Sequence, residues 1–329
     1  MSKYLELVEG SFNESHFDKQ KNQNPYVAYS IKDDRVIYNI VPKEDGYTLI
    51  TLKKVDISNI SYEEVDLGLS SGLKWANKNV GAQTIEDYGT YFSWGNTDGY
   101  TVSGTKFLTV DEACQFFSSL IGETITTKEE LEYMLSQIGM TVDNLGIVDG
   151  YSFDENTYNS TRGGQFTGNT LDAEHDAATS IMGDTWRMPT TEEYQELVNA
   201  VKSSDGTKGI LTCQYEYIDL NGEQQSLVVY NDTDSGYFSV EGLVDDSPIF
   251  KTILGIRFTN DVTGASVYFP PCGNVVGSIL AFIGFRGNYW SSSINDTTLA
   301  RIFSFGPNDV DAGNSYGRYC GLCVRAVKK

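Results

Sequence analysis

The C-terminal segment 287–327 constrains the fold of this chain most; its sequence is GNYWSSSINDTTLARIFSFGPNDVDAGNSYGRYCGLCVRAV. Phe303 and Phe305 alternate with Ser304, which is typical of a strand with one apolar face. Clusters of Asn, Asp, Gly and Ser separate the alternating stretches, and these residues favour turns because they tolerate left-handed backbone or hydrogen-bond to their own chain. The segment therefore predicts short strands joined by polar turns.

The composition of this segment is unusual for an acidic protein. Residues 291–327 contain no Lys, Gln, Glu, Met, Trp or His, although Lys and Glu are common elsewhere in the chain. A stretch of this length ordinarily carries several of these residue types. Either a strand-rich region happens to lack long polar side chains, or a mutational process has filtered its residue types.

A set of residues in this segment resembles the C-terminus of the Fibrobacter succinogenes major paralogous domain. The resemblance rests on Gly287, Tyr289, Trp290, Ser291, Ser292, Ser293, Ala300, Arg301, Phe305, Arg318, Gly321, Val324, Arg325 and Val327. Segments 64–96, 171–178, 186–190, 256–259 and 266–273 are similar to the same family. The resemblance implies a C-type lectin-like fold, as in Bacteroidetes surface proteins and gut phages, and Trp75 and Trp94 are expected to be core anchors.

In some members of this family the C-terminal segment is the variable repeat of a diversity-generating retroelement. Adenine mutagenesis there changes Asn codons but does not produce Lys, Gln, Glu, Met or Trp, which fits the missing residue types. The resemblance then implies that frame residues hold the fold while the side chains between them bind a ligand, with Tyr, Asn, Ser and Asp giving contact area and adaptable hydrogen bonds. The ligand-binding residues expected on this basis are Ile294, Asp296, Thr298, Ile302, Ser304, Asn308, Asp311, Asn314, Tyr316, Tyr319 and Leu322.

These residues are expected to gather on one surface. Ser304 would face solvent if Phe303 and Phe305 face the core, since side chains alternate along a strand. The turn residues 308–316 would be exposed, because a buried loop cannot satisfy its backbone. Tyr316 and Tyr319 would be the aromatic anchors.

Charge and hydropathy narrow the range of partners. The chain has 24 basic and 45 acidic residues, a net charge of −21, which argues against nucleic acid because phosphate binding needs a positive field. The longest apolar run, 278–285, is too short to cross a bilayer, so we expect no membrane insertion. Residues 1–6 contain charge and no signal-peptide core, which favours a virion protein made in the host cytoplasm; an extracellular or cell-surface location is the alternative.

The resemblance also implies the partners. They would be a bacterial cell-surface receptor, either a glycan or a protein, and other virion proteins. Whether the chain forms a homo-oligomer stays open.

The chain offers little material for catalysis or metal binding. His16 and His175 are the only histidines, which disfavours a Ser-His-Asp triad, and Cys320-x-x-Cys323 has no second pair to complete a zinc site. Residues 232–236 resemble a calcium loop, but Gly comes one place early and position twelve is Leu243. We therefore expect no enzyme activity, no catalytic residues, no metal and no cofactor.

Two alternatives to a binding protein stay open. The formylglycine-generating enzymes share the fold and use cysteines near the C-terminus, so a catalyst of that kind is one. A structural virion decoration protein is the other.

The predicted fold class is α+β, in two parts. Residues 1–62 are expected to form a small β module, with a hairpin from 26–31 and 35–40 and further strands at 47–52 and 55–60. The resemblance implies a particle-attachment or oligomerisation segment, and an N-terminal extension of the main sheet is the alternative. Residues 63–329 form the C-type lectin-like ligand-binding domain. In this part the sequence predicts capping boxes at Thr109–Glu112, Thr127–Glu130 and Thr190–Glu193, a long loop over 150–169, a helix over 171–178, and a type I′ turn at Asn221-Gly222.

Overall fold

A computed structural model describes most of the chain. The described residues are 59–109, 124–137, 145–149, 152–243, 249–277 and 279–328, together with strand backbone at 28–32, 35–39 and 46–53 and residues 111, 114, 115 and 118. Strand makes up 38% and helix 16%, in several separate sheets, so the α+β class predicted from the sequence is confirmed.

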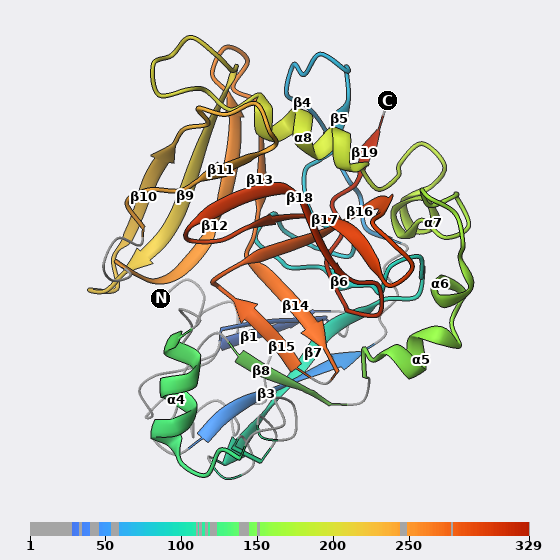
Figure 1. Cartoon of the computed structure of the whole chain (residues 1–329), viewed down its shortest axis with the longest axis vertical. Helices are drawn as coiled ribbons and strands as arrows, with labels where there is room; N and C mark the ends of the chain where they lie inside the picture. The colour runs from blue at the N-terminus through green and yellow to red at the C-terminus, as the bar shows by residue number, and fades with distance from the viewer. Residues whose placement is uncertain are drawn as a thin grey trace. The chain divides into compact units, whose positions relative to one another are not determined.

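The chain divides into two compact units (Figure 1). The first contains residues 1–55, 101–151 and 278–281, and the second contains 56–100, 152–277 and 282–329. The division into residues 1–62 and 63–329 that the sequence suggested stays a prediction.

The described part of the first unit contains paired strands and helix α4 (Lys128–Gln137). Strands β1 (Ala28–Lys32) and β2 (Arg35–Asn39) form an antiparallel hairpin, which confirms the predicted one. Strand β3 (Gly46–Lys53) lies between β7 (Tyr100–Thr109) and β8 (Leu145–Asp149), and β15 (Ile279–Ile283) pairs with β8. Helix α4 (Lys128–Gln137) begins at the predicted Thr127–Glu130 capping box. The predicted strand at 55–60 and Glu112 of the first capping box fall largely or wholly outside the described residues.

The second unit is organised around the C-terminal strands. Their order is β11 (Tyr237–Ser239), β18 (Asp309–Gly317), β17 (Leu299–Phe305), β16 (Gly287–Ile294) and β14 (Cys272–Val276). Neighbouring strands are antiparallel except β14 and β16, which are parallel. The predicted strands and polar turns of this segment are therefore confirmed (Figure 1).

The second unit contains a second sheet. Its strand order is β10 (Gln224–Val229), β9 (Leu211–Asp219), β12 (Phe250–Asn260) and β13 (Ser266–Phe269). The hairpin between β9 and β10 was predicted correctly, but its turn type was not. The Asp219 amide donates to Glu223 O at 2.8 Å, so the loop holds three residues, and Gly222 takes the left-handed position with φ +87°.

A short third sheet joins the two ends of this unit. Strand β5 (Lys74–Ala76) pairs with β4 (Glu64–Asp66) and with β19 (Val327–Lys328). The short strand β6 (Thr90–Tyr91) follows β5 along the chain.

The helices of this unit differ partly from expectation. The region 150–169, expected to be a loop, contains α5 (Glu155–Asn159) and α6 (Arg162–Gln165), capped by Asp154 and Thr161. Helix α7 (Ala177–Met182) begins later than predicted, because the Asp176 carboxylate caps it by accepting from the Thr179 amide. Helix α8 (Thr191–Asn199) has the predicted Thr190–Glu193 capping box. Within the described residues no helix combines the length and apolar character needed to span a bilayer.

The core lies against both faces of the C-terminal strands. On one face Phe303 stacks on Tyr194 of α8, with ring centroids 5.0 Å apart. On the other face Trp290 and Ile302 belong to a core cluster that also contains Leu322. The central part of the sheet is therefore covered on both sides.

Candidate functional site

The predicted frame residues are structural. Trp290 is 0% exposed, and its Nε1 donates to Phe92 O at 2.7 Å, while Arg301 Nη1 donates to Gly313 O at 2.6 Å. Arg325 is also 0% exposed, and Arg325 Nη2 donates to Tyr268 O at 2.7 Å. Trp290 is therefore buried and both arginines bind carbonyl oxygens, as expected of frame residues that hold the fold.

The other predicted anchors are buried as well. Trp75 and Trp94 are each 0% exposed, which confirms their assignment to the core. Trp94 Nε1 donates to Ser291 O at 2.9 Å and so joins the segment around residue 94 to β16.

Arg318 joins two loops at one end of the C-terminal strands. Its Nη1 donates to Thr297 O at 3.2 Å, and its Nη2 donates to Gly163 O at 3.0 Å and to Phe166 O at 2.9 Å. The guanidinium lies 4.6 Å from the centroid of the Trp94 ring, which is a cation–π distance. Arg318 therefore holds the turn 295–298 against helix α6 and its C-cap residue Phe166.

Five of the eleven predicted ligand-binding residues lie at this end of the strands. Asp296 and Thr298 are exposed, whereas Ile294, Tyr316 and Tyr319 are half-buried. Ile294 and Tyr316 are both cross-strand partners of Ala300, so they share one face of the sheet. Asp296 Oδ1 accepts from the amides of Thr298 and Leu299, each at 2.8 Å, and these bonds lower the pKa of that carboxyl.

Three predicted residues are buried, and the prediction that they face solvent is wrong. Ile302, Ser304 and Leu322 are each 0% exposed. The alternation around Ser304 was identified correctly, but both faces of β17 are covered, so neither face reaches solvent there. Ser304 Oγ instead accepts from Asn314 Nδ2 at 3.3 Å.

The three remaining residues do not join the first five. Asn308 is exposed in the turn at the opposite end of β17, about 20 Å from Thr298 for a seven-residue strand. Asp311 and Asn314 are half-buried along β18, and Asp311 Oδ1 accepts from the Gly313 amide at 2.7 Å. The eleven residues therefore do not form one surface as predicted.

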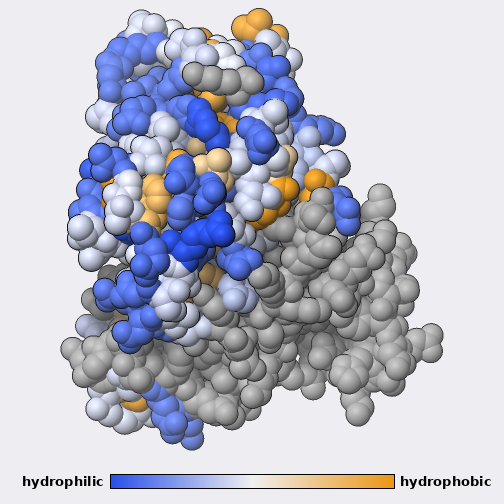
Figure 2. Space-filling model, turned by 90° about the vertical axis from the view of Figure 1, so that its right-hand side faces the viewer, coloured by the Kyte–Doolittle hydropathy of each residue, from blue (hydrophilic) through white to orange (hydrophobic). Residues whose placement is uncertain are grey.

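The end of the C-terminal strands where Ile294 and Tyr316 lie also includes residues from another segment, which the sequence did not indicate. The Leu171 amide donates to Ser292 O and the Ile294 amide donates to Asn169 O, both at 2.9 Å, so the segment 169–171 lies beside the end of β16. Phe166 and Leu171 are half-buried on the same core cluster as Ile294. The side of the molecule shown in Figure 2 has small hydrophobic patches between hydrophilic ones. No local pattern predicts this neighbourhood, because it is made by backbone bonds between distant segments.

Two buried asparagines, Asn274 and Asn288, lie next to Tyr316 in the core. Asn288 Nδ2 donates to Asn274 Oδ1 at 3.1 Å, and the Asn274 side chain lies beside the Tyr316 phenol. Burial raises the pKa of the Tyr316 phenol to about 12, so it is neutral at pH 7.

The residues considered for catalysis are occupied by structural contacts. His175 Nδ1 lies 2.6 Å from Asp172 Oδ1, and its ring packs 4.7 Å from the Phe166 ring. The five cysteines are buried free thiols, and burial raises the pKa of Cys320 to about 12. A neutral, buried thiol is a poor nucleophile.

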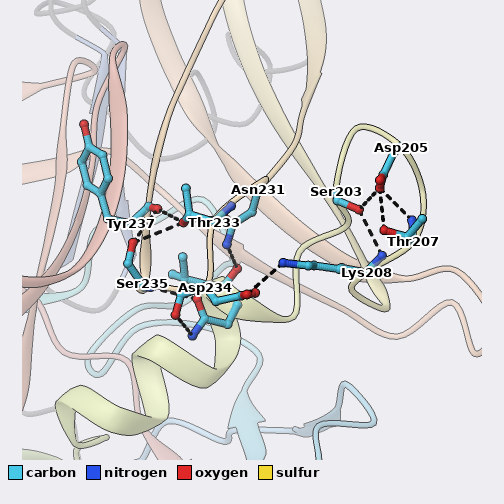
Figure 3. Close-up of polar contacts among 12 residues, drawn as sticks. Ser203, Asp205, Thr207, Lys208, Asn231, Thr233, Asp234, Ser235 and Tyr237 are labelled. Carbon is cyan, nitrogen blue, oxygen red and sulfur yellow. Dashed lines mark hydrogen bonds and ion pairs between the residues drawn. The ribbon is translucent and has the colours of Figure 1, made fainter.

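The segment that resembles a calcium loop is a turn held by its own side chains (Figure 3). Asn231 Oδ1 accepts from the Thr233 amide at 2.9 Å, and Asp234 Oδ2 accepts from Lys208 Nζ at 2.8 Å. Asp205 accepts from Ser203 Oγ at 2.6 Å in the neighbouring loop. Across the parts of the chain that the structure describes, no three His, Cys, Asp or Glu side chains are grouped to hold a metal ion.

Comparison with known proteins adds no relative. No family model, curated protein or solved structure matches the chain.

Proposed function

We propose that the second unit is a C-type lectin-like domain that binds a bacterial cell-surface receptor for a phage. The binding surface is the end of the C-terminal strands, defined by Ile294, Asp296, Thr298, Tyr316 and Tyr319. In this proposal the segment is the variable repeat of a diversity-generating retroelement. Residues 1–62 attach the protein to other virion proteins.

The observation that carries this proposal is that buried structural residues and exposed turn residues alternate within the C-terminal segment. Trp290 and Arg325 are fully buried and hydrogen-bonded to carbonyl oxygens. Asp296 and Thr298, which lie between frame positions, are exposed in a turn that is held by backbone bonds to Leu299 O and by the Asp296 carboxylate. Side chains in such a turn can change without disturbing the core, which is what a variable binding surface requires.

The fold of the second unit supports the C-type lectin-like part of the proposal. Helices α7 and α8 flank a strand-rich body, and strands from both ends of the unit pair with each other. This arrangement suits the C-type lectin-like plan. The burial of Cys320 and Cys323, 1% and 0% exposed, supports a binding role over a cysteine-dependent catalyst.

Cell binding tests the proposal. The wild-type protein and the double variant Tyr316→Ala/Tyr319→Ala would be labelled and incubated with a panel of intact Bacteroidetes cells. We expect the double variant to lose most of the binding, because aromatic anchors contribute much of the energy of an interface. The matched control is Tyr230→Ala/Tyr237→Ala, which removes two exposed tyrosines elsewhere on the chain.

Two results would contradict the proposal. One is unchanged cell binding by a folded Tyr316→Ala/Tyr319→Ala variant. The other is an equal loss in the control pair. The flanking DNA gives an independent test, in which a near-copy template repeat beside a reverse transcriptase is expected.

A further inference from the structure

Five half-buried apolar side chains lie at this end of the strands, and we call this set the apolar row. It consists of Phe166, Leu171, Ile294, Tyr316 and Tyr319, all packed against the same core cluster. Backbone bonds from Leu171 to Ser292 and from Ile294 to Asn169, together with the Arg318 bonds to Phe166 O, fix the two halves of the row side by side. The row therefore joins the C-terminal segment to the loop 166–171.

The polar groups beside the apolar row are already used within the protein. Asp296 Oδ1 accepts from two backbone amides, and the Tyr316 phenol is largely buried beside Asn274. Arg318 directs its terminal nitrogens to three carbonyl oxygens. Within the apolar row itself few donors or acceptors therefore remain to bond the hydroxyl groups of a sugar, whereas an apolar centre is typical of a protein interface.

The rim of the apolar row is acidic. Asp172, Glu174 and Asp296 are exposed, and so is Glu155, whose charge adds to the effects of Cys320 and of burial in raising the pKa of Tyr319. Within the described part of the chain, neither Glu155 nor Glu174 forms an ion pair. Arg318 is only 6% exposed, Arg162 Nη1 donates to Glu174 O at 3.0 Å, and Asp172 is paired with His175. Glu155 and Glu174 therefore keep exposed negative charges at the rim, and the chain carries −21 overall.

From these features we infer that the partner is a protein whose surface has an apolar centre and a rim of Lys and Arg. The contact extends from Tyr316 and Tyr319 onto Phe166 and Leu171, outside the C-terminal segment. An apolar centre excludes water, and complementary charges at the rim speed association and exclude wrong partners. This inference rests on the proposed function and narrows its receptor to a protein.

The experiment uses cells that the wild-type protein binds, before and after two treatments. Proteinase K removes surface proteins, and periodate oxidises surface glycans. We expect protease to abolish binding, periodate to leave it, and raised salt to weaken it, since exposed charges are screened. Binding that survives protease and is lost after periodate would overturn the inference and leave the proposed function standing.

Variants test the extent of the contact. Glu155→Lys/Glu174→Lys should weaken cell binding at least about tenfold, because like charges then face each other at the rim. The control Glu223→Lys/Glu241→Lys makes the same change in net charge at two other exposed positions and should leave binding within about twofold. Leu171→Ala tests the apolar row and should weaken binding about tenfold at unchanged fold, as judged by its thermal midpoint.

The outcomes separate the two claims. Wild-type affinity in both the Glu155→Lys/Glu174→Lys and the Leu171→Ala variants, with loss in Tyr316→Ala/Tyr319→Ala, would overturn the inference alone. Failure of the wild-type protein to bind any cells would remove the proposed function and the inference together.

Discussion

The guanidinium of Arg325 is bound to the side chain of Asn79, which lies 246 residues away in sequence. Arg325 Nε and Nη2 donate to Asn79 Oδ1 at 2.9 and 2.7 Å, and both residues are 0% exposed. No carboxylate pairs with Arg325 among the described residues, and burial lowers its pKa to about 10. The cation is stabilised instead by neutral oxygens and by the Phe269 ring, whose centroid is 4.5 Å away.

Removal of the Asn79 amide should therefore be costly. Asn79→Ala leaves a buried charge without two of its hydrogen bonds, and we expect a loss of about 3 kcal/mol in the free energy of unfolding. Urea denaturation measures it. The control Asn77→Ala removes a bond from the Glu63 amide at a less buried site and should cost under about 1 kcal/mol. Equal losses in the two variants would show that Arg325 does not depend on Asn79.

Trp290 should matter for stability more than for direct contact with a ligand. Trp290→Ala empties a fully buried site and removes the bond to Phe92 O, so we expect a loss of about 3–5 kcal/mol. Thermal and urea denaturation measure it. A variant that melted like the wild type but no longer bound cells would mean that Trp290 belongs to the binding surface.

A substitution at Ser304 tests whether this face of β17 is covered by the core or open to a ligand. Ser304→Tyr places a large side chain in a fully buried position, and we expect overpacking to cost about 1–3 kcal/mol or more. Asn308→Tyr is the matched control, because Asn308 is exposed, and its free energy of unfolding should stay within about 0.5 kcal/mol of wild type. If Ser304→Tyr is as stable as the control, this face is open and Ser304 returns to the candidate ligand-binding residues.

The pH dependence of stability can be tested at Asp205. Bonds from Ser203 Oγ, and then from the Thr207 amide and hydroxyl, lower the pKa of Asp205 from 3.8 to about 2. A lowered folded-state pKa means that the contribution is fully present above pH 3.8 and is lost as the pH falls toward 2. Asp205→Asn should thus lower the urea midpoint at pH 6, and its difference from wild type should shrink as the pH falls from 4 to 2.

Asp184→Asn is the reference for this titration. Asp184 is exposed and lies outside the 203–207 turn, so its variant makes the same chemical change there and should keep a urea midpoint at pH 6 close to that of the wild type. A difference between Asp205→Asn and wild type that stays constant down to pH 2 would contradict the assignment.

Local sequence patterns determined the elements of this protein. The alternation around Ser304 and the polar turns predicted β16, β17 and β18, and Thr190 with Glu193 predicted the start of α8. These features depend on residues a few positions apart, where backbone periodicity and capping bonds act, so a sequence contains them directly.

The tertiary structure decided which of those elements reach solvent. Alternation shows that Ser304 and Phe303 point to opposite sides of β17, but it does not show that Tyr194 covers one side and Leu322 the other. The neighbourhood of Leu171 and Ile294 is likewise set by backbone bonds between segments more than a hundred residues apart. Whether a residue is buried depends on which distant segments pack against it. Packing, and not the neighbouring residues in sequence, therefore determined which side chains can form a binding surface.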